Sequence, residues 1–359
     1  RAIHDPKKRV VIQIAPAVRV AVGEAFGIPA GENVLDKLVT ALKLMGVDEV
    51  YDTTFGADFT TIAESEEFLE RLKNGGPFPM FTSCCPAWVK YLENENPKYL
   101  KNISTCKSPM EMVGAIFRDK YAEKDAQDGR TTYHIAIMPC TAKKMEAARP
   151  EFSHDGVRDV DYVLTTRELC RMFREAGVNL ANMNDEQFDS PLGQSTGAAD
   201  IFGVTGGVLE AALRSVRSVL TNEDLTGDAI NFRAVRGLDG IKEAKVEIAP
   251  GLTVNAAVCS GLGNARKILE MVRKEPNRFQ AIEIMACPGG CINGGGQPFT
   301  HGDSTLLEKR MRGLYLEDAS KPLRMSHNNP DIKKLYEEFL GEPGSEKAHH
   351  LLHTKYHSK

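Results

Sequence analysis

The sequence predicts an α/β protein with two lobes of mainly parallel β-sheet, each flanked by helices. Short apolar or β-branched runs alternate with helical patterns over most of the chain, and this alternation is typical of parallel sheets covered by helices. The length of 359 residues suits one large core or two lobes of ordinary size. We expect two lobes with a boundary near residue 160 and a functional site in the cleft between them.

The strand and helix patterns follow one another from the N-terminus. Predicted strands cover residues 10–15, 49–54, 78–82, 133–138, 161–165, 254–259 and 281–286. Predicted helices cover residues 18–26, 60–73, 88–95, 142–148, 166–176 and 206–219. Residues 305–359 differ, because they are helical and charged, contain Pro322 and Pro330, and lack strand signals. We therefore predict a core of residues 1–304 and a C-terminal segment, 305–359, that wraps around it.

Composition excludes several classes of protein. Hydrophobic residues make up 42% and charged residues 26%, and the net charge is −4, so no general attraction to nucleic acid is expected. No apolar run reaches the length of a membrane span, which predicts no membrane insertion. The chain starts at Arg1 without a signal-peptide pattern. We expect a cytoplasmic protein, with the periplasm left open because this start is compatible with a processed or excised piece.

Eight cysteines are the most informative residues of the chain. They are Cys84, Cys85, Cys106, Cys140, Cys170, Cys259, Cys287 and Cys291. A disulfide framework is not expected in a chain of this size and low cysteine density. Cys106, Cys170 and Cys259 are interpreted as buried apolar residues, the usual state of a free thiol. The other five lie in three loops that follow predicted strands, which indicates metal ligation or redox chemistry.

The three loops are expected to meet. They span residues 81–88, 138–146 and 283–298. Because the carboxyl ends of parallel strands converge on one crevice, their thiols can gather at one point and hold a [4Fe–4S] cluster or a zinc ion. Zinc sites usually use paired Cys-x-x-Cys motifs, which the chain lacks. The glycines beside Cys291 allow the backbone to approach a bulky inorganic group, and Lys143 and Lys144 can offset thiolate charge.

These loops resemble the three signature motifs of [FeFe]-hydrogenases. The matching segments are Thr82-Ser83-Cys84-Cys85-Pro86-Ala87-Trp88, Met138-Pro139-Cys140-Thr141-Ala142-Lys143-Lys144-Met145-Glu146, and Glu283-Ile284-Met285-Ala286-Cys287-Pro288-Gly289-Gly290-Cys291-Ile292-Asn293-Gly294-Gly295-Gly296-Gln297-Pro298. Further matches at Ala15-Pro16, residues 203–207 and Arg236-Gly237 extend the resemblance over nearly the whole chain. The resemblance implies a hydrogenase that reversibly reduces protons to H2, by heterolytic chemistry.

The resemblance also implies a cofactor, the H-cluster, in which a [4Fe–4S] cluster is joined through one cysteine sulfur to a diiron unit with CO, cyanide and azadithiolate ligands. Its cubane ligands would be Cys85, Cys140, Cys287 and Cys291, with Cys291 as the bridge. Cys84 would carry protons to and from the azadithiolate. The cofactor-binding residues implied by the family are Lys143, Ser108, Pro109, Pro16, Ala17, Met138, Met285, Phe202 and Gly203.

The family's proton route passes outward from the thiol through a carboxylate, a hydroxyl, a second carboxylate and an arginine. The matching positions, taken in that order, are Glu67, Ser104, Glu64 and Arg71. The residues alone would not indicate this, because Glu64, Glu67 and Arg71 share one helical face and such a face is normally solvated.

Some positions depart from the family pattern. Met110 replaces a Gln found in many relatives, Ala17 replaces a Ser found in some, and Ala87 replaces a common Gly. These changes can alter potential or catalytic bias without touching a cluster ligand. Two other functions therefore remain as alternatives: a hydrogen sensor built on the same core, and an iron–sulfur assembly protein without the diiron unit. The second is disfavoured because such proteins are expected to lack Cys84 and Lys143.

The expected partners follow from what the chain lacks. It carries no additional ferredoxin-type cysteine motif, so electrons are expected from a ferredoxin-like donor or from an accessory iron–sulfur domain or subunit. The resemblance also implies maturation proteins that install the diiron unit. Near the C-terminus, His349, His350 and His353 suit either a metal site or the end of a helix with solvent-facing histidines, and we favour the latter.

Overall fold

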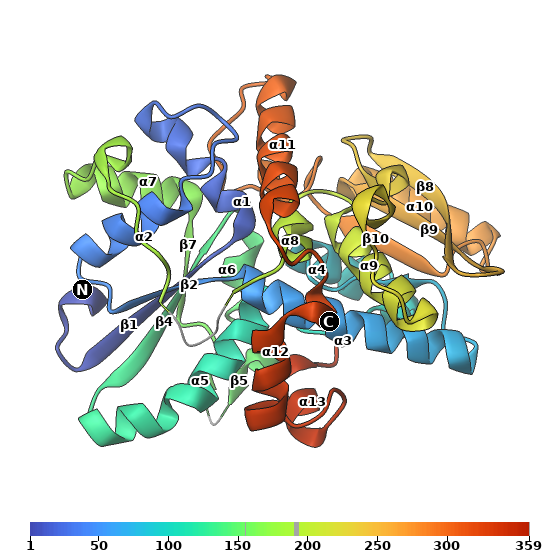
Figure 1. The fold of residues 1–359 in the computed structure, drawn as a ribbon, viewed down its shortest axis with the longest axis horizontal. Coiled ribbons are helices and arrows are strands. Elements are labelled where there is room, and N and C mark those ends of the chain that lie inside the picture. The colour runs from blue at the N-terminus through green and yellow to red at the C-terminus, as the bar shows by residue number, and fades with distance from the viewer. Residues whose placement is uncertain (155, 190–193, 359) are drawn as a thin grey trace.

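Two β-sheets, one in each lobe, form the centre of the molecule (Figure 1). The computed structural model describes residues 1–154, 156–189 and 194–358. The first sheet has the strand order β2-β1-β4-β7, and all its pairings are parallel. Its strands are β1 (Lys8–Ile14), β2 (Glu49–Asp52), β4 (Thr131–Met138) and β7 (Tyr162–Thr165). The predicted α/β class with parallel sheets is confirmed.

The second sheet has the order β3-β10-β9-β8. Its strands are β3 (Met80–Phe81), β8 (Ile241–Ala249), β9 (Leu252–Ser260) and β10 (Ala281–Met285). β10 pairs in parallel with both β3 and β9, whereas β8 is an antiparallel edge strand that the sequence analysis missed. Because β3 belongs to this second sheet, a boundary near residue 160 does not divide the strands into two continuous sets, and that expectation is wrong.

Helices cover both sheets and fill the space between them (Figure 1). The helices of the first 303 residues are α1 (Pro16–Arg19), α2 (Leu35–Leu44), α3 (Thr54–Asn74), α4 (Pro86–Glu95), α5 (Pro109–Asp128), α6 (Ala142–Glu146), α7 (Thr166–Glu175), α8 (Gly197–Asp200), α9 (Gly207–Thr221) and α10 (Leu262–Lys274). The helix predicted over residues 18–26 is instead α1 followed by a 3₁₀ segment, Val22–Phe26. The β-branched Val20 and Val22 and the flexible Gly23 disfavour a continuous α-helix there.

The C-terminal segment is helical and packs on both lobes. It contains α11 (Ser304–Ser320), α12 (Pro330–Leu335), a π-helical turn (Tyr336–Leu340) and α13 (Glu346–Leu352). α11 stands between the lobes in Figure 1, and apolar residues of α12 and α13 join one buried cluster with residues of α3 and α5. The division into residues 1–304 and 305–359 stays a prediction. In the described part of the chain, no helix combines the length and apolarity that crossing a membrane requires.

Candidate functional site

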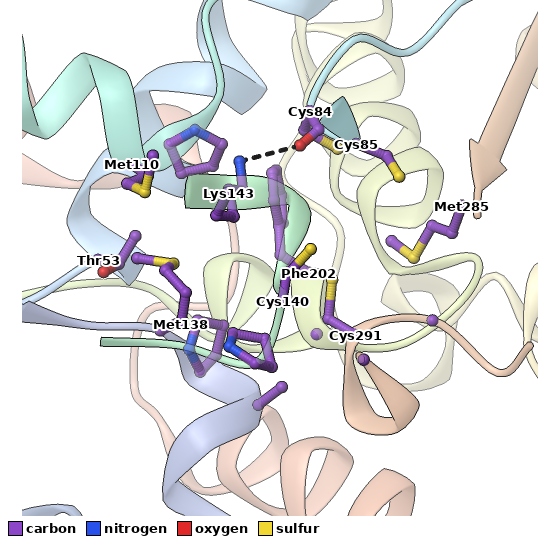
Figure 2. Close-up of a pocket in the computed structure, with 18 of the residues that line it drawn as sticks. Thr53, Cys84, Cys85, Met110, Met138, Cys140, Lys143, Phe202, Met285 and Cys291 are labelled. Carbon is purple, nitrogen blue, oxygen red and sulfur yellow. Dashed lines mark hydrogen bonds between the residues drawn. The ribbon is translucent and has the colours of Figure 1, made fainter. Parts of the chain in front are cut away.

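The loops after β3, β4 and β10 meet at one cavity of about 90 Å³. Five cysteines line it, and they are Cys84, Cys85, Cys140, Cys287 and Cys291. They come from both sheets, and each follows the carboxyl end of its strand, where parallel strands direct their loops into a shared crevice. Figure 2 shows Cys85, Cys140 and Cys291 approaching the same space from different segments.

Close backbone contacts bring the second and third loops together. A Cβ atom at Gly294 would lie 2.2 Å from the carbonyl oxygen of Pro139, and one at Gly290 would lie 2.6 Å from the backbone nitrogen of Thr205. The backbone N–H of Gly296 also donates to the Pro139 carbonyl at 2.8 Å. Only glycine permits such approaches, so the glycines of the third loop hold Cys287 and Cys291 beside Cys140.

A buried glutamate fixes the strand that carries the third loop. Glu283 of β10 accepts hydrogen bonds from the backbone N–H groups of Gly206 (2.6 Å) and Leu209 (2.9 Å) at the start of α9. An anionic group is stabilised at a helix N-terminus by the free N–H donors there. This contact ties α9 to the end of β10, just before the cavity.

The electrostatics of the cavity suit a cationic metal group. Burial raises the thiol pKa of Cys85, Cys140, Cys287 and Cys291, and neighbouring thiolates raise it further. Four such thiols cannot ionise together without a compensating positive charge. Iron in a thiolate-ligated cluster supplies that charge. The donor set therefore fits an iron–sulfur cluster.

Lys143 is the cation that reaches the cavity. Burial opposes its charge, but the Glu146 carboxylate at 2.6 Å more than compensates and raises the pKa of the Lys143 ammonium. Its Nζ also donates to the carbonyl oxygen of Cys84 at 3.1 Å (Figure 2). Lys143 is thus held as a fixed positive charge close to the thiols.

The remaining wall is almost entirely apolar. The predicted pocket residues that line the cavity are Pro16, Ala17, Pro109, Met138, Met285, Phe202 and Gly203. Ser108 does not line it, although its buried Oγ has no hydrogen-bond partner among the described residues. Thr53 and Met110 also face the cavity (Figure 2). Thr53 was not anticipated, since it follows β2 at a position with no recognisable motif.

The structure changes the order of the acidic residues behind Cys84. The Glu64 carboxyl is 1% exposed, and its charge raises the pKa of the Cys84 thiol, after burial itself. Glu67 lies farther out, where it pairs with Arg71 at 2.5 Å and keeps 12% of its side chain exposed. The resemblance to the family led us to expect Glu67 next to the thiol and Glu64 farther out, and that order is wrong. The structure gives Cys84, Glu64, Ser104, Glu67 and Arg71.

Ser104 connects the two carboxyl groups. Its Oγ donates to Glu67 Oε2 at 3.0 Å, and the same side chain lies close enough to Glu64 to lower the pKa of that carboxyl group. Burial, followed by the charge of Glu67, raises the pKa of Glu64 to about 8. Glu64 therefore holds a proton at neutral pH and can release it near pH 8.

The polar face of α3 points into the protein and not into solvent. Arg71 donates to the carbonyl oxygens of Asn102 and Ile103, both at 2.9 Å, and Glu64 is buried. The segment that follows α4 supplies these carbonyl acceptors, so the charged face can be buried without unpaired groups. Reading the helix periodicity alone would have assigned this face to solvent.

His353 contacts Glu67 through Thr105, a connection that the sequence analysis did not foresee. Thr105 donates to Glu67 Oε2 from its backbone N–H (2.9 Å) and from its Oγ1 (3.1 Å), and the same Oγ1 lies 2.8 Å from His353 Nδ1. The expectation of solvent-facing histidines is thus wrong for His353, which is half-buried, although His349 and His350 are exposed.

Glu67, Cys106 and His353 also place one potential metal-ligand atom each within 4.8 Å of one another. However, both Glu67 oxygens already accept hydrogen bonds, from Arg71 on one side and from Ser104 and Thr105 on the other. We therefore interpret this group as part of a hydrogen-bond chain. Cys106, Cys170 and Cys259 are buried, in keeping with their expected packing role.

Comparisons with known proteins agree with these features. The family model described as iron only hydrogenase large subunit, C-terminal domain, matches residues 8–295, and the one described as iron hydrogenase small subunit matches residues 304–359. The chain is 50% identical to NADP-reducing hydrogenase subunit HndD of Solidesulfovibrio fructosivorans and 43% identical to iron hydrogenase 1 of Clostridium pasteurianum, in each case over 99% of this chain. It spans only 61% and 62% of the lengths of these relatives.

Solved structures and more distant relatives extend this picture. The apo [FeFe]-hydrogenase HydA1 from Chlamydomonas reinhardtii, variant C377H, superposes with a TM-score of 0.86 and 39% identity, covering 100% of this chain and 96% of that one. A more distant similarity links the chain to cytosolic iron-sulfur assembly component 3 of Bos taurus, at 31% identity over 99% of this chain and 76% of that protein.

Proposed function

Since the chain belongs to the iron-only hydrogenase family, we propose that it is the catalytic part of an [FeFe]-hydrogenase that reversibly reduces protons to molecular hydrogen. One observation carries the proposal. Four thiols that suit an iron–sulfur cluster share their cavity with a fifth thiol, Cys84, and that thiol lies beside a buried carboxyl group that titrates near pH 8. Ligation and proton delivery therefore meet at one place.

The residues that would hold the cofactor are those of the cavity. Cys85, Cys140, Cys287 and Cys291 would ligate a [4Fe–4S] cluster, with Cys291 also joining it to a diiron unit that bears CO, cyanide and azadithiolate. When bound, this H-cluster would supply the metal centre at which electrons and protons combine. Lys143 would donate a hydrogen bond to a cyanide ligand, because it is the buried cation of the cavity wall. Ser108 lies outside the cavity lining, so we assign it no contact with the cofactor.

The chain's own residues move the protons. The raised pKa of Cys84 keeps a proton on the thiol at neutral pH, so Cys84 can donate it into the cavity and be reprotonated by Glu64. Glu64 regains its proton from Ser104, whose hydroxyl in turn takes one from Glu67. Each transfer passes between groups that share a hydrogen bond or lie side by side in a buried setting.

The apolar wall has a separate task. Met138, Met285 and Phe202 keep bulk water from the cavity, so protons enter through the polar residues behind Cys84. Met110, on the same wall, replaces a polar residue and makes the cavity more apolar. A hydrogen-sensing role is the second candidate, because this substitution can lower turnover while leaving binding intact.

An iron–sulfur assembly role is disfavoured by two residues of the cavity. Cys84 and Lys143 both face it, and a protein that only transfers or scaffolds clusters has no use for a buried proton-donating thiol. For electrons, we propose a ferredoxin-like donor or an accessory iron–sulfur domain. Maturation proteins would install the diiron unit.

A Cys84→Ala variant tests the proposal. After maturation with the diiron unit, we expect wild-type and variant proteins to bind similar amounts of iron and to show infrared bands of metal-bound CO and cyanide. The variant should lose most hydrogen evolution, roughly 100-fold or more, because it lacks the group that delivers the proton. Cys170→Ala, which removes a buried thiol that does not line the cavity, is the matched control and should retain activity.

The outcomes separate the three functions. Missing carbonyl and cyanide bands in the matured wild type would indicate an assembly protein. Normal bands with very slow turnover in the wild type would indicate a sensor. Undiminished turnover in the Cys84→Ala variant would disprove the role assigned to the thiol.

A further inference from the structure

We propose that Thr105 and His353 form a second proton connection between Glu67 and solvent, in addition to the direct exposure of part of the Glu67 side chain. This inference rests on the proposed function and extends it to the C-terminal segment, which contributes His353. The segment would then be more than a structural wrap, since it would supply a residue of the proton route.

Backbone pairing holds the imidazole in place. Thr354 N–H donates to the Thr105 carbonyl at 2.7 Å, Lys107 N–H donates to the Leu352 carbonyl at 2.8 Å, and Cys106 and His353 form an antiparallel bridge. The last residue of α13 and the two residues that follow it are thereby paired with the three residues that precede Ser108. This pairing holds the backbone of His353 beside that of Thr105, within reach of the side-chain contact between them.

The side chains complete a continuous chain of hydrogen bonds. Glu67 Oε2 accepts from Thr105 Oγ1 at 3.1 Å, and Thr105 Oγ1 lies 2.8 Å from His353 Nδ1. The His353 ring stacks on that of the exposed His349, with 4.6 Å between the ring centroids and 22° between the planes. The chain of hydrogen bonds therefore runs from the partly exposed Glu67 carboxylate to the half-buried His353 imidazole, which stacks on an exposed ring.

Arg71 cannot carry protons in the same way. A guanidinium donates hydrogen bonds but does not give up its proton in proteins. Arg71 contacts Glu67 and three backbone carbonyls, so it anchors the carboxylate. An imidazole, in contrast, accepts a proton at one nitrogen and releases it from the other. Burial and the nearby His349 lower the pKa of His353 to about 4, so its ring is neutral at pH 7 and available for this exchange.

The proton balance is simple. His353 takes a proton from water at Nε2 and passes the Nδ1 proton to Thr105 Oγ1. The hydroxyl passes its own proton to Glu67 Oε2, which becomes a neutral carboxyl group. The ring ends in the other neutral tautomer. It returns to the starting tautomer when it turns Nδ1 toward solvent, where Nδ1 gains a proton from water and Nε2 loses one, and then turns back to Thr105. One proton moves from solvent to Glu67, and no electron is transferred.

Three variants test the connection in the matured protein. Thr105→Val removes the hydroxyl with little change in size, and His353→Gln keeps a polar side chain that cannot shuttle protons. We expect each to lower hydrogen evolution roughly threefold to tenfold under excess reductant, less than the loss of a sole acid–base group, because Glu67 keeps direct contact with water. The double variant should be no slower than either single variant, since both break the same chain.

Two further measurements exclude a purely structural effect. Imidazole added to a His353→Ala variant should restore the rate in a saturable manner, which a packing defect would not allow. In the protein without cofactor, the ¹⁵N resonances of His353 should show a neutral ring and should shift in the Thr105→Val variant. The exposed His357→Gln serves as the matched control, with no effect on either measurement.

The results distinguish this proposal from the one it rests on. If the matured wild-type protein makes no hydrogen, both the proposed function and the second proton connection are rejected. If the wild-type protein makes hydrogen but the variants match its rate, only the second proton connection is rejected. The same holds if imidazole does not restore the rate of the His353→Ala variant.

Discussion

Glu64 is a carboxyl group whose surroundings favour its neutral form. Its side chain, on α3, is buried in the protein near Cys84. The Ser104 hydroxyl lies between it and the charged Glu67. A carboxyl group in such a place stays protonated several pH units above its usual range. The same property that suits Glu64 for holding a proton also makes the stability of the folded protein depend on pH.

We predict that Glu64→Gln removes this dependence. The folded-state pKa is about 8, against an ordinary value of 4.5, so between these pH values only the unfolded chain loses the proton. Wild-type stability should therefore fall as pH rises from 4.5 to 8, by at most about 5 kcal/mol. Glutamine does not titrate, so the variant should gain stability relative to wild type across this window.

Chemical denaturation of the cofactor-free protein at several pH values measures this effect. Glu308→Gln, a substitution at an exposed position of α11, is the control and should follow the wild-type curve. A Glu64→Gln curve parallel to wild type throughout would show that the carboxyl group is not protonated in the folded state.

For single residues, the sequence motifs identified the cysteines of the cavity. The order of the acidic residues and the contact between Thr105 and His353 became known only from the structure. The order of Glu64 and Glu67 depends on how α3 is rotated against its neighbours, which helical periodicity gives only when one face is apolar. The contact between Thr105 and His353 joins residues 248 positions apart. No local pattern encodes such a contact, because the pairing depends on where the C-terminal segment returns to the core.

The crossing of α3 and α5 shows how elements position the site. At Gly56, an added Cβ atom would lie 2.4 Å from the carbonyl oxygen of Pro109 and 2.6 Å from Val113 Cγ2. The two helices therefore touch backbone to backbone near the first turn of α5, where Pro109 and Met110 reach the cavity. A side chain at position 56 would push this turn away from α3.

We expect Gly56→Ala to destabilise the protein by about 1–3 kcal/mol, because overpacking outweighs the better helix propensity of alanine. Gly263→Ala in α10 is the matched control, since a Cβ atom there meets nothing within 4 Å. It should be neutral or stabilising by up to about 1 kcal/mol. Urea denaturation measures the free energy of unfolding of both variants. Equal changes in the two variants would mean that the close contact between α3 and α5 at Gly56 does not constrain these helices.

Sequence patterns revealed elements unevenly, for physical reasons. The central strands β1 and β10 are buried on both faces, because both faces of their sheets are covered, and they therefore contain mostly apolar residues. Strand β8 shows alternating burial at its centre, where Ala244, Val246 and Ile248 are buried and their neighbours are exposed, so its period of two was present but overlooked. Helix α5 was missed because its first half is buried on all sides and its second half is largely exposed, which leaves no single apolar face.

For the whole molecule, buried ion pairs join the C-terminal segment to the core. Asp318 of α11 binds Arg214 of α9 through both carboxylate oxygens, at 2.8 and 2.9 Å, and also pairs with Arg324 at 2.7 Å. Arg214 in turn binds Glu210 of α9. Burial works against ionisation, but the hydrogen bonds from Arg214 and Arg324 keep the pKa of Asp318 below its usual range. Like the apolar cluster that joins α12 and α13 to α3 and α5, this network connects segments that lie more than a hundred residues apart in the sequence.

We predict that Asp318→Ala destabilises the protein by about 3–5 kcal/mol, because it leaves Arg214 buried with an excess of positive charge. Asp228→Ala is the matched control, since Asp228 also pairs with an arginine, Arg233, but both side chains are more than 70% exposed. That change should cost at most about 1 kcal/mol. Similar denaturation midpoints for the two variants would mean that the network adds little. A large loss of stability confined to Asp318→Ala would show that the network matters. If the backbone amides of Thr105 and His353 also exchange faster in that variant, attachment of α11 helps to hold the C-terminal residues against the proton route.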